Sequence, residues 1–194
     1  MIRICVYFCL LLFLVGFSYA FSQETNHMRI NDIGIGIKLD ANFNQLPDDF
    51  KLGINVSTPY FLDNWLSIRL EFDYGFFRGI PASSIYSNET WSTYYAFKSG
   101  IIVVASQRTA IIRPYVELGG IGFIPSSEFT EEKFAWGIYG LLGFELLFDP
   151  ESFYCFYFEF NGTGILSGGD TSKFLPPAIY GTGIIVTLGY RFYL

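Results

Sequence analysis

Histidine and cysteine, on which much enzyme and metal chemistry depends, are scarce in this chain of 194 residues. The single histidine, His27, lies near the N-terminus, and Cys5 and Cys9 lie in the first ten residues, which leaves Cys155 as the only later cysteine. The main part of the chain therefore lacks a histidine that could activate a nucleophile or bind a metal. We expect no catalytic, cofactor-binding or metal-binding residues, and a protein that is not an enzyme.

Charged residues are also few, at 15% of the chain, and the formal net charge is −6. This acidic balance argues against nucleic acid as a partner, because phosphates require a basic surface. Hydrophobic residues make up 51% and aromatic residues 20% of the chain, which is too apolar for an ordinary soluble domain. Beyond the N-terminal segment, however, no apolar run approaches a membrane-spanning helix. A membrane β-barrel has this composition because its apolar residues are spread over alternating strands.

The N-terminus has the features of a secretory signal. Arg3 precedes an apolar segment over residues 4–17, and small residues follow at Ser18 and Ala20. The apolar segment is shorter than the ~18 residues of a spanning helix, which disfavours the alternative of an uncleaved anchor. We predict a signal peptide over residues 1–22, with cleavage after Ala20 or Ser22, and a single barrel domain over residues 23–194.

Period-two alternation of apolar and polar residues marks the strands, and it is clearest at the C-terminus, where IIVTLGYRFYL ends the chain. Most of the alternating segments approach the ~9–11 residues that a tilted strand needs to cross a bilayer. The pattern predicts an all-β fold, an eight-stranded antiparallel up-and-down transmembrane β-barrel. The expected strands are 32–39, 50–57, 66–77, 93–104, 111–120, 134–148, 153–161 and 184–194.

The connections between these strands alternate in length. Those after the first, third, fifth and seventh strands are long, at 40–49, 78–92, 121–133 and 162–182, and the other three are shorter. Long loops on one side and short turns on the other are typical of barrels in the bacterial outer membrane. This topology places both termini in the periplasm and four loops at the cell surface.

The polar face of the strands contains eleven charged residues, and all of them share one parity. A secreted lipocalin-like barrel would turn this face outward, but the same face also holds many glycines, which suit a narrow interior better than a solvated surface. We therefore expect a charge network in the lumen, with basic and acidic groups paired. Its members are Lys38, Lys51, Arg69, Glu71, Asp73, Lys98, Arg113, Glu117, Glu145, Glu159 and Arg191.

Two of these carboxylates, Glu71 and Asp73, are neighbours on one face and could act as an acid–base pair. We favour instead that they are partners of Arg69 and Arg113, because breaking a buried ion pair is costly. Aromatic residues near the strand ends are expected to form girdles at the membrane interfaces. They are Tyr60, Phe61, Trp65, Phe76, Phe77, Trp91, Phe134, Trp136, Phe153, Tyr154, Tyr190, Phe192 and Tyr193.

Four segments resemble the last four strands of small outer-membrane barrels of the OmpX, opacity and OmpA membrane-domain type. They are IRPYVELGG at 112–120, GLLGFE at 140–145, FYFEF at 156–160 and TLGYRF at 187–192. The resemblance implies the barrel architecture and no particular activity. It also implies a C-terminal signal for the barrel-assembly machinery, matched here by Tyr190 and Phe192, with Leu194 where the family usually ends in phenylalanine.

Function is less constrained than architecture. The first hypothesis is a structural or surface-interaction protein that binds through its extracellular loops, and the alternative is a narrow channel or transporter of small ligands. The expected partners are outer-membrane lipid, lipopolysaccharide, the barrel-assembly machinery and an extracellular protein. The loops carry acidic residues that could bridge divalent cations to lipopolysaccharide or dock a basic protein, although such charges often only keep loops solvated. These residues are Asp48, Asp49, Glu89, Glu128, Glu131, Glu132 and Asp170.

Overall fold

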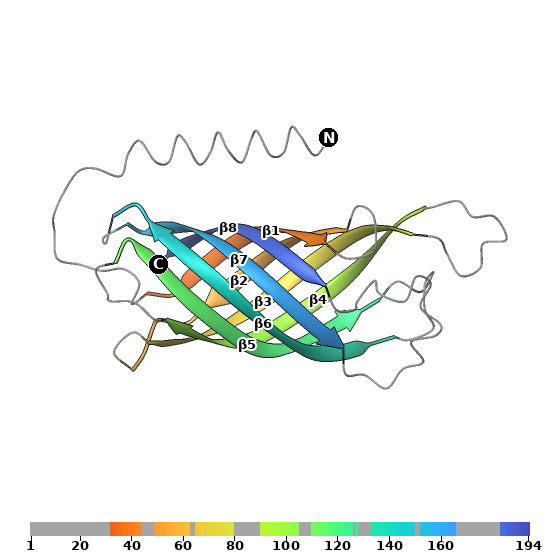
Figure 1. Ribbon diagram of the computed structural model, residues 1–194, viewed down its shortest axis with the longest axis horizontal. Helices are drawn as coiled ribbons and strands as arrows, with labels where there is room; N and C mark the ends of the chain where they lie inside the picture. The colour runs from red at the N-terminus through yellow and green to blue at the C-terminus, as the bar shows by residue number, and fades with distance from the viewer. Residues whose placement is uncertain are drawn as a thin grey trace.

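The fold, seen in a computed structural model, is a closed barrel of eight antiparallel strands in sequence order, with β1 paired to β8 (Figure 1). The structure describes residues 32–43, 49–62, 65–79, 90–104, 110–125, 127, 133–149, 152–165 and 183–194. The strands are β1 Gly34–Phe43, β2 Phe50–Ser57, β3 Leu66–Gly79, β4 Thr90–Val104, β5 Ile112–Ile124, β6 Ala135–Leu147, β7 Tyr154–Ile165 and β8 Ile184–Tyr193. The predicted fold class, a closed eight-stranded up-and-down barrel, is confirmed.

Closure comes from the first and last strands, which pair along their whole length from Gly34 opposite Tyr193 to Phe43 opposite Ile184. Every strand therefore has two hydrogen-bonded neighbours, and the sheet has no free edge. We call the end of the barrel that contains the C-terminus proximal and the opposite end distal; the C-terminus marks the proximal end in Figure 1. No helix among the described residues is long and apolar enough to cross a bilayer.

Five of the predicted strands end too early or start too late. β1 continues to Phe43, β3 to Gly79, β5 to Ile124 and β7 to Ile165, and β4 already begins at Thr90. Polar residues and glycines at these positions suggest loops in the sequence, but the neighbouring strand offers hydrogen-bond partners there. Asp40, for example, lies opposite both Lys51 and Thr187, and residue Gly164 lies opposite Ile138.

These longer strands correct the predicted connections. The connection between β1 and β2 shrinks to residues 44–49, so it is no longer than the turn between β6 and β7. Three distal connections, 80–89, 125–134 and 166–183, are long, rather than the four that the sequence predicts. The signal peptide at residues 1–22 lies outside the described residues, as do the loop residues Asp48, Glu89, Glu128, Glu131, Glu132 and Asp170.

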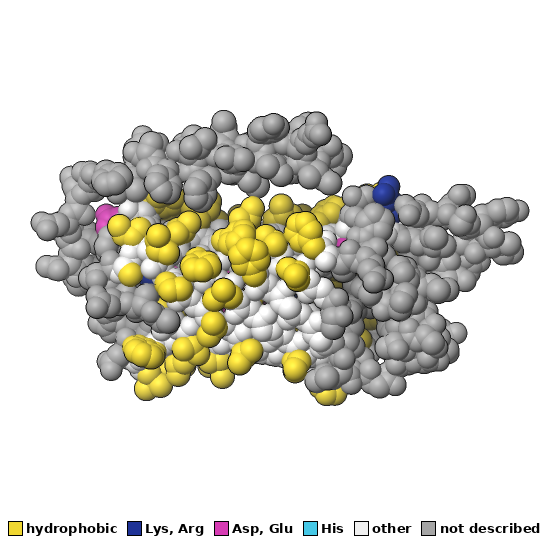
Figure 2. All heavy atoms as spheres, in the orientation of Figure 1, with side chains coloured by type: hydrophobic (Ala, Val, Ile, Leu, Met, Phe, Trp, Pro, Cys, Tyr) yellow, Lys and Arg dark blue, Asp and Glu magenta, His cyan; other side chains and the backbone are white. Residues whose placement is uncertain are grey.

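The two faces of the barrel wall differ sharply in chemistry. The outward residues are aliphatic, aromatic or small, and Figure 2 shows hydrophobic side chains scattered over the visible wall. Arg78, near the distal end of β3, is the only charged residue on the outward parity of the described strands. The inward residues are charged or otherwise polar, tyrosine, small or, as at Leu141, hydrophobic. The barrel is thus apolar outside and polar inside.

Glycines on the inner wall give room to large side chains from the strands beside them. A Cβ atom at Gly189 would lie 1.9 Å from Cζ of Tyr157, and one at Gly143 would lie 2.3 Å from Cζ of Tyr115. Three members of the expected aromatic girdles need a correction, because Tyr60, Phe77 and Tyr193 are buried inside the barrel, whereas the tryptophans of the expected girdles are more than half exposed. Phe77 and Tyr193 are on the inward parity of their strands, and Tyr60 folds inward from the connection after β2.

Candidate functional site

The lumen is the candidate functional site, because it holds all eleven charged residues of the predicted network, each at most 5% exposed. Asp40, on the inward face of β1, and Asp49, just before β2, are two further buried acids, which makes six basic and seven acidic groups. Asp49 was expected in a surface loop, but it is 3% exposed and accepts hydrogen bonds from Asn42 and Tyr94. The sequence assigned Asp40 to a loop, although it continues the inward parity of Lys38. All of these groups except Lys51 and Asp49 form three clusters along the barrel axis, which we call distal, central and proximal.

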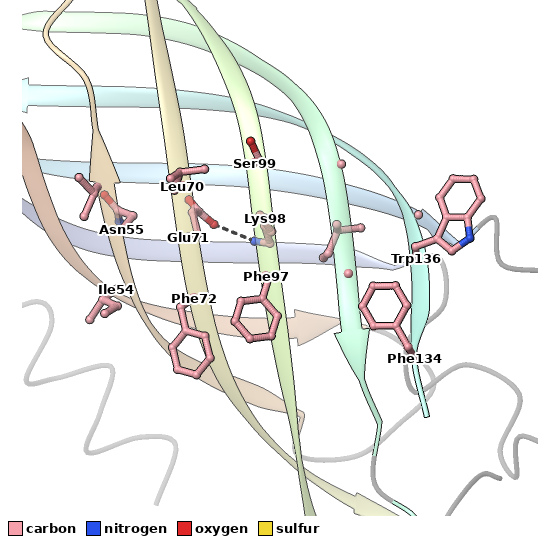
Figure 3. Close-up of a pocket in the computed structure, with 15 residues that line it drawn as sticks. Ile54, Asn55, Leu70, Glu71, Phe72, Phe97, Lys98, Ser99, Phe134 and Trp136 are labelled. Carbon is pink, nitrogen blue, oxygen red and sulfur yellow. Dashed lines mark ion pairs between the residues drawn. The ribbon is translucent and has the colours of Figure 1, made fainter. Parts of the chain in front are cut away.

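The distal cluster joins Lys38 and Lys98 to Asp40, Glu71 and Asp73. Nζ of Lys38 lies 2.7 Å from Glu71, 3.0 Å from Asp73 and 3.3 Å from Asp40. Lys98 approaches the same three carboxylates at 3.2–3.9 Å. Figure 3 shows Glu71 on β3 facing Lys98 on β4, while their neighbours Phe72 and Phe97 point away from the ion pair. Two ammonium groups thus hold three carboxylates.

Lys51 lies near this cluster but does not join it. Its side chain is 2% exposed, and no carboxylate of the described residues lies within ion-pair distance of its Nζ atom. Further along the wall, Thr187 donates a hydrogen bond of 2.7 Å to Asp40. Thr187 was not among the expected site residues, since a hydroxyl on the inner parity gives no signal that it pairs with a charge.

The central cluster is organised around the guanidinium group of Arg69. Its three nitrogen atoms contact three different carboxylates: Nε lies 3.0 Å from Glu71, Nη1 lies 2.6 Å from Glu159, and Nη2 contacts Glu117. Glu71 belongs to the distal cluster as well, so the two clusters are continuous. Tyr115 donates to Glu159 and Tyr139 donates to Glu117. Every charge in this layer therefore has at least two polar partners.

The proximal cluster has a different composition, with Arg113 and Arg191 sharing one carboxylate, Glu145. Nη1 of Arg113 lies 3.4 Å from Glu145, and Nη1 of Arg191 contacts its other oxygen. Tyr60 also donates to Glu145, at 3.0 Å. Burial, together with the Glu145 carboxylate, raises the pKa of the Tyr60 phenol, so this hydroxyl remains a donor. Nothing in the sequence marks Tyr60 as a lumen residue, because it lies outside the alternating segments.

The pairing therefore differs from the expected one in part. Glu71 contacts Arg69 as expected, whereas Asp73 contacts the two lysines and Arg113 contacts Glu145. Alternation predicts the face of a residue but not which partner its side chain reaches across the lumen. Since Glu71 and Asp73 are both held by ammonium groups, neither is arranged as a free general base.

The three residues of the expected assembly signal lie at the proximal end of β8. Tyr190 and Phe192 point outward and pack on aromatic rings of β7 and its preceding turn, with the Tyr190 ring 5.4 Å from that of Tyr154. Leu194 follows the strand, and its backbone N–H and carbonyl both pair with Ile33. The outward aromatic rings of β7 and β8 therefore form one continuous group at the proximal end.

Other chemistry in the lumen is limited. Cys155 is fully buried, and its Sγ atom lies 3.7 Å from the hydroxyl of Tyr193. Among the described residues, no group of three or more His, Cys, Asp or Glu side chains is arranged to hold a metal ion. Across that part of the chain, the arrangement offers buried ion pairs and phenol hydrogen bonds.

Comparison with known proteins gives a likeness in fold. No protein-family model matches the chain, and no curated protein matches it. Among solved structures, the chain is similar to the N-terminal β-barrel domain of OprF from Pseudomonas aeruginosa, with a TM-score of 0.54 and 13% sequence identity over 84% of this chain and 96% of that domain. A structure of the NanC porin aligns with a TM-score of 0.33 and 8% identity over 84% of this chain and 87% of the porin. The OprF comparison shows that the two chains share a barrel fold.

Proposed function

We propose that this protein is a bacterial outer-membrane barrel that spans the lipid bilayer and acts as a structural or surface-interaction protein through its distal connections. The observation that carries the proposal is the reversed polarity of the wall. Outward residues such as Leu118 are as much as 72% exposed, whereas Arg69, Arg113 and Arg191 are 0% exposed. A soluble monomer rarely exposes so continuous an apolar surface, but a bilayer requires it.

The backbone supports the same proposal. A segment inside a bilayer must satisfy its N–H and C=O groups within the protein, and a closed barrel does so because each strand is paired on both sides. The secretory signal expected over residues 1–22 and the barrel fold shared with the OprF domain agree with this location. In this topology the C-terminus and the turns at its end face the periplasm, and the distal connections face lipopolysaccharide and the cell exterior.

The contents of the lumen argue that the barrel acts at its ends rather than as a pore. An eight-stranded barrel has an interior that side chains can fill, and here six basic and seven acidic groups are buried in it. Tyr115, Tyr139 and Tyr157 occupy the space between the charged clusters, each at most 3% exposed. At the proximal end, buried Ile102, Val104 and Leu147 add an apolar layer. Because the interior is filled, we expect the protein to act through the connections at the ends of the barrel.

Insertion can be tested with the native tryptophans, because all three, Trp65, Trp91 and Trp136, are described and are more than half exposed. Single-tryptophan variants, with phenylalanine at the other two positions, are refolded into vesicles whose lipids carry bromine at a known depth on the acyl chain. We expect quenching by bromine near the headgroups and little quenching by aqueous acrylamide. Strong acrylamide quenching without lipid quenching would refute membrane insertion.

The surface role is tested with lipopolysaccharide as the probe. We expect lipopolysaccharide with Mg²⁺ to raise the thermal midpoint of the detergent-refolded protein, because the distal connections carry carboxylates that a divalent cation can bridge to phosphate. Replacing residues 168–177 or 126–133 with short Gly–Ser linkers should keep the heat-modifiable barrel and reduce this rise. Equal midpoints with and without lipopolysaccharide would exclude it as the partner of the connections.

The narrow-channel alternative rests on one specific observation, the continuity of polar groups along the lumen from Lys51 through Arg69 to Arg191. Rearranged ion pairs in such a column could admit a thin file of water. Planar-bilayer recordings separate the two functions: we expect no large, stable conductance, and steady passage of sugars would instead establish the channel.

A further inference from the structure

The proximal cluster contains more positive than negative charge. Arg113 on β5 and Arg191 on β8 are both 0% exposed, and each contacts only one carboxylate of the described residues, that of Glu145. Glu145 in turn divides its two oxygens between the arginines and also accepts a hydrogen bond from Tyr60. Two guanidinium groups therefore share a single negative charge in a layer shielded from solvent.

The hydrogen-bonding capacity of these arginines is largely unused. Atoms Nε and Nη2 of Arg113, and the same two atoms of Arg191, are buried and have no hydrogen-bond partner among the described residues. Arg69 provides the internal comparison: its Nε and Nη2 atoms also lack a hydrogen bond, but its three nitrogens lie within ion-pair distance of three different carboxylates. Four donor atoms without acceptors, next to a surplus positive charge, are costly in a desolvated interior.

The aromatic rings around the cluster help the cations but cannot replace an anion. The guanidinium carbon of Arg113 lies 4.7 Å from the ring centre of Tyr60, and that of Arg191 lies 4.9 Å from the ring centre of Tyr157. Cation–π contacts of this kind stabilise a cation by less than an unpaired buried charge costs. The ring faces also supply no oxygen or nitrogen acceptor for Nε and Nη2.

We propose that the proximal cluster binds one small inorganic anion of the halide class between the guanidinium groups of Arg113 and Arg191. A monovalent ion matches the surplus of one positive charge within this cluster, and it is a hydrogen-bond acceptor of the kind that the unpaired donor atoms lack. A large organic anion does not suit this layer, because Cys155, Tyr157 and Tyr193 pack around it at 0–1% exposure. The ion supplies Arg113 and Arg191 with the negative charge that the carboxylates supply to Arg69 in the central cluster. This site does not depend on the proposed role of the distal connections.

The first test is a halide titration of the whole refolded protein in detergent. Thermal unfolding is followed in chloride or bromide and, at equal ionic strength, in gluconate, which is too large for the site. We expect a saturable rise of several degrees in the midpoint with chloride and bromide and none with gluconate, since a ligand that binds the folded state stabilises it by mass action. Equal midpoints in the three salts would overturn the proposal.

Two matched variants assign the effect to the cluster. Arg113→Met leaves Arg191 and Glu145 as a balanced pair and should abolish the halide-dependent rise. Arg69→Met removes a cation that already has three carboxylate partners and should keep the rise, although its midpoint is lower in every salt. A halide effect that survives Arg113→Met would contradict the assignment.

Crystals of the unmodified protein grown with bromide provide a direct readout that does not require any variant to fold. We expect an anomalous bromide peak beside Nε and Nη2 of Arg113 and Arg191. Density for water alone at that position, without an anomalous signal, would overturn the proposal even if the salts differed in the thermal assay.

Discussion

The inner and outer walls of the barrel are built from the same strands, yet their side chains have opposite polarity. In β4, Phe97 and Ile101 point outward at 44% and 54% exposure, while Lys98 between them points inward at 3%. Alternate residues of a strand face opposite sides of the sheet, so a shift of one residue would exchange the two environments completely. The parity of a residue therefore determines which wall it belongs to, and each wall should tolerate only its own kind of side chain.

The largest effect is expected from removing a cation from the inner wall. Arg69→Met would leave Glu71, Glu117 and Glu159 without the guanidinium group that contacts all three. We expect a loss of about 3–5 kcal/mol in the free energy of unfolding, because breaking a buried ion pair strands its partner charge. Urea unfolding in lipid vesicles measures this loss. The outer-wall control is Leu118→Met, which should change stability little, and an Arg69→Met barrel as stable as this control would contradict the network.

A slightly smaller effect is expected from adding a cation to the outer wall. Leu142 points outward from the middle of β6 at 46% exposure, so Leu142→Arg places a charge in the hydrocarbon region. The expected cost is about 2–4 kcal/mol in the same assay, if the position lies near the bilayer midplane. Leu62→Arg, beyond the end of β2, is the control with the same chemical change. Equal, small effects of both variants would show that the outer wall does not face lipid.

Parity explains why so much of the fold could be predicted from the sequence. The alternation Ile184, Val186 and Leu188 against Thr187 and Gly189 identifies a two-faced strand without reference to any neighbour. The ends of the strands cannot be predicted in this way, because residues such as Gly122 and Thr163 continue a strand only if a partner residue lies opposite them. The local sequence determines which face of the sheet a residue occupies, whereas pairing with the neighbouring strands determines where the strand ends.

The same distinction applies to the candidate site. The sequence placed eleven charges on one parity, and the structure places all eleven in the lumen. It could not show that Arg113 contacts Glu145 rather than Asp73, since that depends on the register of β5 and β6, which places these two residues directly opposite each other. Tyr60 could not be found at all, because it enters the lumen from a connection rather than from a strand.

Glycines offer a test of intermediate size, because the inner and outer walls use them differently. Gly189 faces the lumen, where a Cβ atom would lie 1.9 Å from the ring of Tyr157, whereas Gly162 faces outward with nothing within 4 Å. Overpacking a filled interior costs about 1–3 kcal/mol, so we expect Gly189→Ala to lower stability by that amount. Gly162→Ala should be neutral or slightly stabilising in the same unfolding assay. A reversed order of the two variants would mean that Tyr157 has room to move inside the barrel.

The smallest effect is expected from single hydroxyl groups on the two walls. Tyr115 points inward and donates to Glu159, whereas Tyr95 points outward at 42% exposure. In Tyr115→Phe, Glu159 keeps its contact with Arg69 but loses one donor, so we expect a loss of about 1 kcal/mol. Tyr95→Phe removes no hydrogen bond to a buried charge and should differ from the unmodified protein by less than that. Because both changes delete one oxygen from the same residue type, the difference between them measures the value of a phenol hydrogen bond inside the lumen. A loss of stability in Tyr95→Phe equal to that in Tyr115→Phe would show that the central cluster gains nothing from its tyrosines.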